Sequence, residues 1–121
     1  GCYVLGENVM EGRYIVYKTN KVVRRVSLDE ILYVESDGRQ IKLETECGTL
    51  SYYEKISAIA PSFDDSFCRA MSYCYINLSK VRLMSGGIVN FGCGKALVLG
   101  RDSFLRAKRE YYNYLRRSIQ S

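Results

Sequence analysis

The 121-residue chain divides into short segments of alternating apolar and polar residues, separated by turn signals such as Asp37-Gly38, Cys47-Gly48 and Ser85-Gly86-Gly87. A side-chain period of two is that of a strand, and short glycine-containing turns join antiparallel neighbours. Many short strands at regular spacing favour antiparallel sheets. The expected fold class is therefore mainly β, an antiparallel multi-sheet domain. Strands are expected over residues 14–18, 22–26, 31–36, 40–45, 49–53, 67–77, 78–84, 88–91 and 95–99.

The most regular alternation is FCRAMSYCYIN, residues 67–77, which a pair of strands can use. One face is polar, and Asn77 lies at its end. An asparagine at the end of a strand is either a turn residue that caps its own backbone or a side chain free to contact a ligand. The other face is small and apolar, so its side chains are expected in the core: Cys68, Ala70, Cys74 and Ile76.

One short helix and one C-terminal helix are expected beside the strands. Residues 53–60 repeat apolar side chains at helical spacing, and Pro61 ends the run. Residues 102–119 form the only long helical segment, which Asp102 or Ser103 can cap. The stripe expected on its apolar face is Phe104, Lys108, Tyr111, Leu115 and Ile119.

The length predicts one domain with a core that needs no metal or disulfide. Residues 14–121 are expected to form this domain, whereas residues 1–13 show no period and are interpreted as a linker or an extra edge segment. No apolar run is long enough to cross a bilayer, and the first residues lack the basic and apolar regions of a secretory signal. A cytoplasmic protein without a membrane partner is expected.

The cysteines and the missing histidine limit the chemistry of the chain. Five cysteines without a C-x-x-C pair, in a sequence that has no histidine, do not resemble a disulfide framework or a mixed zinc site. No nucleophile elbow, phosphate-binding loop or dinucleotide fingerprint is present, and no histidine can serve as a general base. The sequence therefore predicts a non-catalytic domain with no metal site and no cofactor.

Charge is distributed unevenly along the chain. Residues 1–65 carry eight basic and eleven acidic side chains, whereas residues 66–121 carry ten basic and two acidic ones. A net charge of +8 in one half favours a polyanionic partner, although a solvated basic helix accounts for part of the excess.

Three expected turns carry side chains that can read nucleic acid. Arg39 and Gln40 follow Asp37-Gly38, Asn77 ends its strand, and Arg101 follows Gly100. An arginine can present its fork to guanine, and asparagine or glutamine can pair with adenine. Alternatively, Arg39 is a solvated hairpin tip and Arg101 pairs with Asp102 or Asp65.

These patterns resemble the LytTR-type DNA-binding domain of bacterial transcription regulators over about residues 14–117. The resemblance is carried by the F-x-R spacing and the terminal Ile-Asn of residues 67–77, by ILYVESDGRQIKLET at residues 31–45 and by LVLGRDSFLRAKREYYNYL at residues 97–115. Met71, Tyr73 and Gly100 stand where the family usually has His, Ser and Ser.

The resemblance implies DNA binding by loops that enter successive major grooves and touch the minor groove between them. By position, Arg101 matches the base-contacting arginine of the family and Asn77 its asparagine, and the first-loop contact falls at Arg39 or Gln40. The side chains expected to contact phosphates are Arg69, Ser72, Lys80 and Arg106.

The partner implied by the resemblance is promoter duplex, bound by a dimer at paired repeats, and many such regulators carry a receiver domain upstream. Two other functions fit the residues. One is a protein-interaction module with a basic face. The other is a single-strand binder that stacks bases on tyrosines, namely Tyr73, Tyr75, Tyr111, Tyr112 and Tyr114.

A first prediction concerns the thiols. We expect Cys68 and Cys74 to be buried and unoxidised, because both lie on the apolar face of their strands. Elemental analysis should find no zinc, and the intact mass after non-reducing purification should be that of the reduced chain. One bound metal per chain, or a mass lower by two hydrogens, would contradict this prediction.

Overall fold

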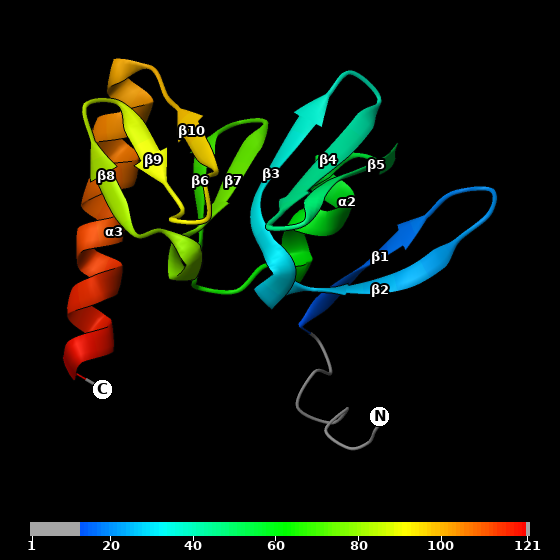
Figure 1. Cartoon of the computed structure of the whole chain (residues 1–121), viewed down its shortest axis with the longest axis horizontal. Helices are drawn as coiled ribbons and strands as arrows, with labels where there is room; N and C mark the ends of the chain where they lie inside the picture. Colours follow the sequence, from blue (N-terminus) through cyan, green and yellow to red (C-terminus); the bar gives the residue numbers. More distant parts are fainter. Residues whose placement is uncertain (1–12, 121) are drawn as a thin grey trace.

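The computed structural model describes residues 13–120. The segment expected to be a linker or an extra edge segment, residues 1–13, therefore lies outside the described range except for its last residue. The described chain contains ten strands, two α-helices and three short 3-10 turns (Figure 1). The elements are, in order, β1 (Tyr14–Lys18), β2 (Val23–Ser27), η1 (Leu28–Glu30), β3 (Ile31–Asp37), β4 (Gln40–Thr45), β5 (Gly48–Tyr53), α2 (Ile56–Ile59), η2 (Ala60–Ser62), β6 (Phe67–Met71), β7 (Cys74–Asn77), η3 (Leu78–Lys80), β8 (Leu83–Ser85), β9 (Ile88–Asn90), β10 (Ala96–Val98) and α3 (Arg101–Gln120).

The strands form three antiparallel sheets: a β1-β2 ribbon, a five-stranded sheet in the order β5-β4-β3-β7-β6, and a three-stranded sheet in the order β10-β9-β8. The predicted fold class, mainly β with one short and one C-terminal helix, is confirmed. Within residues 13–120, no helix combines the length and the apolar character needed to cross a membrane.

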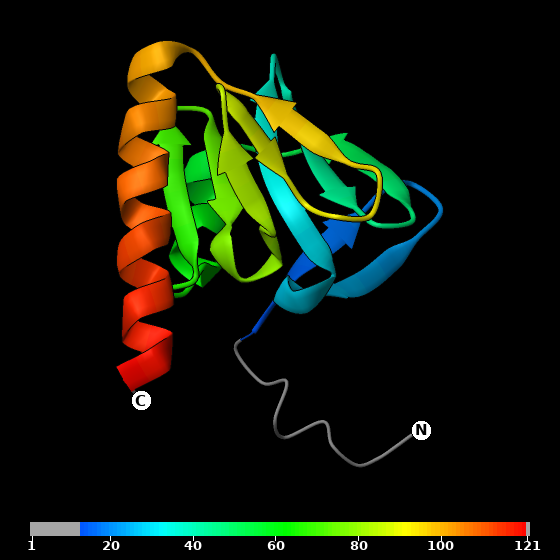
Figure 2. The ribbon, with the colours of Figure 1, turned by 60° about the vertical axis from the view of Figure 1, so that its left-hand side comes forward.

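The five-stranded sheet is the central layer of the domain (Figure 2). One of its faces packs on the three-stranded sheet and α3, and the other packs on the β1-β2 ribbon and α2. The side chains predicted for the core are buried on the face that packs on the three-stranded sheet and α3, namely Cys68, Ala70, Cys74 and Ile76. Burial raises the pKa of the Cys68 thiol to about 11 and that of the Cys74 thiol to about 12, so both remain protonated and unreactive near neutral pH.

Two predicted segments differ from the structure by more than one residue at an end. Residues 78–84 are not a strand, because the 3-10 turn η3 occupies Leu78–Lys80 and β8 begins only at Leu83. The helix predicted over residues 53–60 is shorter, since Tyr53 still pairs with Gln40 as the last residue of β5.

The face of α3 that packs on the domain also differs from the predicted stripe. Phe104 and Tyr111 pack as expected, and the Tyr111 hydroxyl donates a 2.7 Å hydrogen bond to the Val81 carbonyl oxygen. Leu115 and Ile119 are 42% and 76% exposed, because the last turns of α3 extend past the strands (Figure 1). Ala107 and Tyr114 complete the packed face, and Lys108 is exposed.

The side chain of Asn77 joins the end of β7 to η1 and to the start of β3. Its side chain is 1% exposed, and its Nδ2 donates to the carbonyl oxygens of Leu28 at 3.2 Å and Ile31 at 2.9 Å. Its Oδ1 accepts from the backbone N–H of Ser79 at 3.1 Å and from the Ser79 hydroxyl at 2.6 Å. The amide therefore caps η3 and ties it to η1, at the end of the domain where the chain leaves the central sheet.

A second contact joins the central sheet to the three-stranded one. Lys95 Nζ, just before β10, lies 2.8 Å from a carboxylate oxygen of Glu44 in β4. Burial by itself would raise the pKa of Glu44, but the hydrogen bonds from Lys95 and Thr49 lower it below its ordinary value. The carboxylate therefore stays ionised at neutral pH and holds the two sheets together.

A second prediction follows from the buried amide. Asn77→Ala removes the buried hydrogen bonds to the carbonyl oxygens of Leu28 and Ile31 and the cap of η3, so the free energy of unfolding should fall by roughly 2–4 kcal/mol. Urea denaturation measures the change. Asn113→Ala, on an exposed position of α3, is the matched control and should change stability by no more than about 0.5 kcal/mol. Equal changes in the two variants would contradict the role given to Asn77.

Candidate nucleic-acid interface

Four turns lie at one end of the domain, the upper end in Figures 1 and 2. They are the β3–β4 turn, the β6–β7 turn, the β8–β9 turn and the start of α3. Backbone hydrogen bonds join them in two pairs. The N–H of Ser36 donates to the Tyr73 carbonyl oxygen at 2.8 Å, and that of Leu99 donates to the Gly87 carbonyl oxygen at 2.9 Å. We call these four turns the upper turns.

Arg39 lies at the tip of the β3–β4 turn. Asp37 pairs with Gln40, which leaves a two-residue turn in which Gly38 has a φ of +63°. Such a turn needs a left-handed residue, and glycine takes that conformation without strain. The Asp37 carboxylate is 3.1 Å from Lys42 Nζ, so it is already neutralised. Arg39 is exposed, and no side chain among residues 13–120 pairs with its guanidinium, whereas Gln40 is half-buried.

The β6–β7 turn consists of Ser72 and Tyr73, both exposed. Arg69 lies beside it, with a guanidinium nitrogen 3.4 Å from the Ser72 carbonyl oxygen. Arg106, on the second turn of α3, donates at 2.8 Å to the Ala70 carbonyl oxygen and thereby ties the helix to the same strand. Three of the four residues predicted to contact phosphates therefore lie around this turn.

Arg101 is the first residue of α3 and is exposed. The first helical hydrogen bond, from the Phe104 N–H to the Gly100 carbonyl oxygen at 2.8 Å, fixes the backbone on both sides of it. The alternative pairing of Arg101 with Asp102 or Asp65 does not occur among the described residues. Its guanidinium is free to reach a ligand.

Asn77 and Lys80 lie at the opposite end from the upper turns, around η3 (Figure 1). The prediction that Asn77 contacts a base is wrong, because its amide is buried and its hydrogen bonds are used within the domain. The alternative, a turn residue that caps its own backbone, describes it correctly. Within residues 67–77, the polar residue that lies in the upper turns is Ser72.

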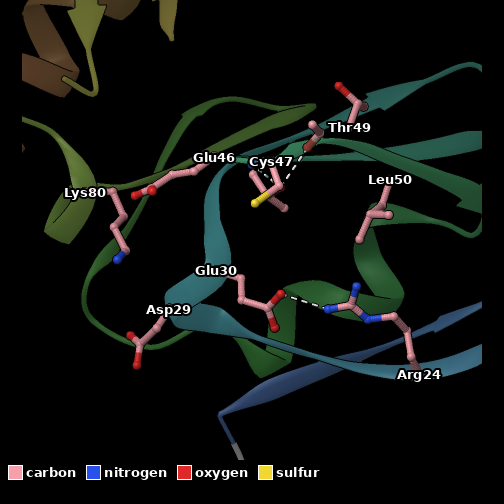
Figure 3. Close-up of a pocket in the computed structure, with 10 residues that line it drawn as sticks. Arg24, Asp29, Glu30, Glu46, Cys47, Thr49, Leu50 and Lys80 are labelled. Carbon is pink, nitrogen blue, oxygen red and sulfur yellow. Dashed lines mark hydrogen bonds and ion pairs between the residues drawn. The ribbon is translucent and has the colours of Figure 1, made fainter. Parts of the chain in front are cut away.

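Lys80 lines a separate hollow of about 460 Å³ (Figure 3). Its wall includes the carboxylates of Asp29, Glu30 and Glu46, and Glu30 already accepts from Arg24 at 2.8 Å. Three carboxylates beside one half-buried lysine do not favour a phosphate, because like charges repel. The structure thus gives no support to a phosphate contact at Lys80.

The tyrosines do not form one stacking surface. Tyr75 packs against Phe63 with ring centroids 5.0 Å apart, and Tyr111 and Tyr114 pack on the core. Tyr73 is exposed at the β6–β7 turn and Tyr112 on the outer side of α3. Single-strand binders stack successive bases on neighbouring aromatic rings, and this arrangement is not of that kind.

Comparisons with known proteins found a matching family model and a similar solved structure. The family model described as LytTr DNA-binding domain matches residues 21–119. A solved structure of the LytTr DNA-binding domain of a putative methyl-accepting/DNA response regulator from Bacillus cereus superimposes with a TM-score of 0.66 and 14% sequence identity, covering 83% of this chain and 96% of that one. No curated protein matches the sequence.

The family model covers well over half of the chain, and the solved structure has the same fold. The upper turns present free arginines, and the described residues hold no group of three or more side chains that could bind a metal. The chain belongs to the LytTR family of DNA-binding domains, the non-catalytic effector domains of bacterial transcription regulators.

Proposed function

We propose that the upper turns read promoter duplex in two successive major grooves, with Arg39 and Gln40 at one groove and Arg101 at the other. The proposal rests on the positions of two exposed arginines without ion-pair partners, Arg39 and Arg101. They are 62 residues apart in the sequence, but the turns that carry them lie at opposite ends of one row (Figure 1). A guanidinium can donate two parallel hydrogen bonds to guanine O6 and N7. Arg39 is therefore assigned to base reading together with Arg101.

Between the two arginines, the β6–β7 turn supplies the contacts to the backbone. Ser72 offers a hydroxyl at the tip, and Arg69 and Arg106 lie on either side of it with most of their donors unused. Hydrogen bonds of this kind fix the register of the protein on the duplex and carry no sequence information. In this proposal these residues face the minor groove that separates the two major grooves. They thereby set the distance between the two base-reading arginines.

The complete regulator is proposed to bind as a dimer at paired repeats in the cytoplasm, with a receiver domain upstream. Two arginines and one glutamine distinguish only a few base pairs, and each mismatched pair typically costs about 1–3 kcal/mol. One such domain cannot single out a site among about a million competitors, so a second copy on a second half-site is needed. The solved relative is itself part of a putative response regulator.

A third prediction tests for contact with the DNA backbone. If about four phosphates are neutralised, affinity for duplex DNA should fall roughly a hundredfold between about 50 and 200 mM salt, because condensed counterions are released on binding. Fluorescence anisotropy with a labelled duplex measures the slope of log affinity against log salt. An affinity that is flat over this range, or a preference for the single strand over the duplex, would contradict the proposal.

A fourth prediction separates base reading from general attraction. Arg101→Ala and Arg39→Ala should each reduce affinity for a site selected from a random duplex pool by about 1–3 kcal/mol and affinity for random duplex much less. Arg116→Ala, on the far end of α3, is the matched control and should not change the ratio of the two affinities. Thermal unfolding of all three variants should match that of the parent chain.

Equal losses on the selected and the random duplex would instead make the arginine a phosphate contact. A loss of thermal stability with no loss of binding would make it a structural residue. Either outcome would contradict the assignment of that arginine to base reading.

A further inference from the structure

The β1-β2 ribbon is a basic segment within the acidic half of the chain. Residues 13–28 contain five basic and no acidic side chains, although residues 1–65 carry eleven acids and eight bases. Three of the five are engaged: Arg13 bonds to Asp29 and Asp64, Arg24 bonds to Glu30, and the Arg25 guanidinium lies 4.5 Å from the centre of the Tyr14 ring. The remaining two are Lys18 and Lys21.

Lys18 and Lys21 flank the tip of the ribbon and are both exposed. Neither forms an ion pair within residues 13–120. The tip itself is held in one conformation, because Thr19 Oγ1 accepts from the N–H groups of Lys21 at 3.2 Å and Val22 at 3.1 Å, and the Thr19 N–H donates to the Val22 carbonyl oxygen at 2.8 Å. Two free ammonium groups are thus presented on a fixed turn.

A hollow of about 600 Å³ separates this tip from the edge of the five-stranded sheet. No carboxylate lines it, and most of its side chains can donate hydrogen bonds. The wall on the sheet side begins at Gln40, the residue after Arg39, so the hollow adjoins one end of the row of upper turns. Its lining residues are Lys18, Thr19, Asn20, Gln40, Ser51, Tyr52 and Tyr53.

We propose that the ribbon tip and this hollow hold the DNA backbone beyond the Arg39 turn, and so extend the footprint of the domain on that side. The inference rests on the proposed function, because it takes the duplex to lie across the upper turns. A surface rich in hydroxyl, amide and ammonium donors and free of carboxylates is suited to phosphate oxygens. The tip lies below the level of the β3–β4 turn in Figure 1, and lysine side chains are long and flexible enough to reach outward from it.

This contact is independent of sequence. Ammonium groups bind phosphates as point charges, so the ribbon adds affinity equally on every duplex. It also makes the footprint asymmetric, because the Arg101 end of the row has no ribbon. The base-reading arginines then decide where the domain binds, and the ribbon increases how tightly it stays there.

The test compares two double variants that each remove two positive charges. Lys18→Ala with Lys21→Ala should make the slope of log affinity against log salt shallower by about 2, since each neutralised phosphate contributes about 0.9. The loss should be the same factor on the selected and on the random duplex. Arg109→Ala with Arg116→Ala, on exposed positions of α3, is the matched control and should change the slope by much less. Thermal unfolding should be unchanged in both, because all four side chains are exposed.

A second measurement locates the contact. The selected duplex is shortened from each end in turn, and binding is measured again. The parent chain should lose affinity when the flank on the Arg39 side is removed, and the ribbon double variant should be insensitive to the same truncation.

A ribbon variant with the slope and flank dependence of the parent chain would overturn this inference. The proposed function would still stand in that case, provided that Arg101→Ala keeps its selective effect on the chosen site. A parent chain that binds no duplex would overturn both.

Discussion

The arrangement of the layers depends on one buried amide. Asn77 ends β7, and its side chain holds the carbonyl oxygens of Leu28 and Ile31, which lie 49 and 46 positions earlier in the chain. The Oδ1 atom of the same side chain caps η3, the turn through which the chain leaves the central sheet for β8. Both donors and the acceptor of the amide are paired inside the protein, where an unpaired group would be costly. The crossing between the two larger sheets is therefore fixed at the end of the domain opposite the upper turns.

With that crossing fixed, antiparallel pairing places the turns. The β3–β4, β6–β7 and β8–β9 hairpins run away from the Asn77 end and reverse at the other, so their tips reach the same side (Figure 1). Two polar contacts hold the layers in register: Glu44 with Lys95 between the sheets, and Arg106 with the Ala70 carbonyl oxygen between α3 and β6. Residues far apart in sequence thus form one surface without any tertiary contact between the arginines themselves.

What could be predicted from the sequence is what local chemistry decides. Asp37-Gly38 specifies a tight turn, and the residue after it must project. The exposed position of Arg39 was therefore predictable, and so was that of Arg101 at the start of a helix. The role of Asn77 was not, because its partners lie in a distant segment and the residue suits both a cap and a base contact. The alternation of residues 67–77 suited a pair of strands but did not mark the turn at Ser72, since Tyr73 continues the period of two through it. The period of α3 predicted a helix, but which face packs depends on the position of β6.

The proposed reading of DNA through turns places a requirement on those turns that a recognition helix meets by its own hydrogen bonds. A flexible loop would lose conformational entropy on binding, and that loss would weaken the complex. Here the β3–β4 turn has only two residues, and Glu54 further holds it by donating its N–H to the Arg39 carbonyl oxygen. The turn also contains an acid, Asp37, which would repel a phosphate if it were free. Lys42 pairs with that carboxylate from the neighbouring strand, so Arg39 is the unpaired charge of the turn. Under the proposed function, Lys42 therefore supports the Arg39 contact without having to touch the DNA itself.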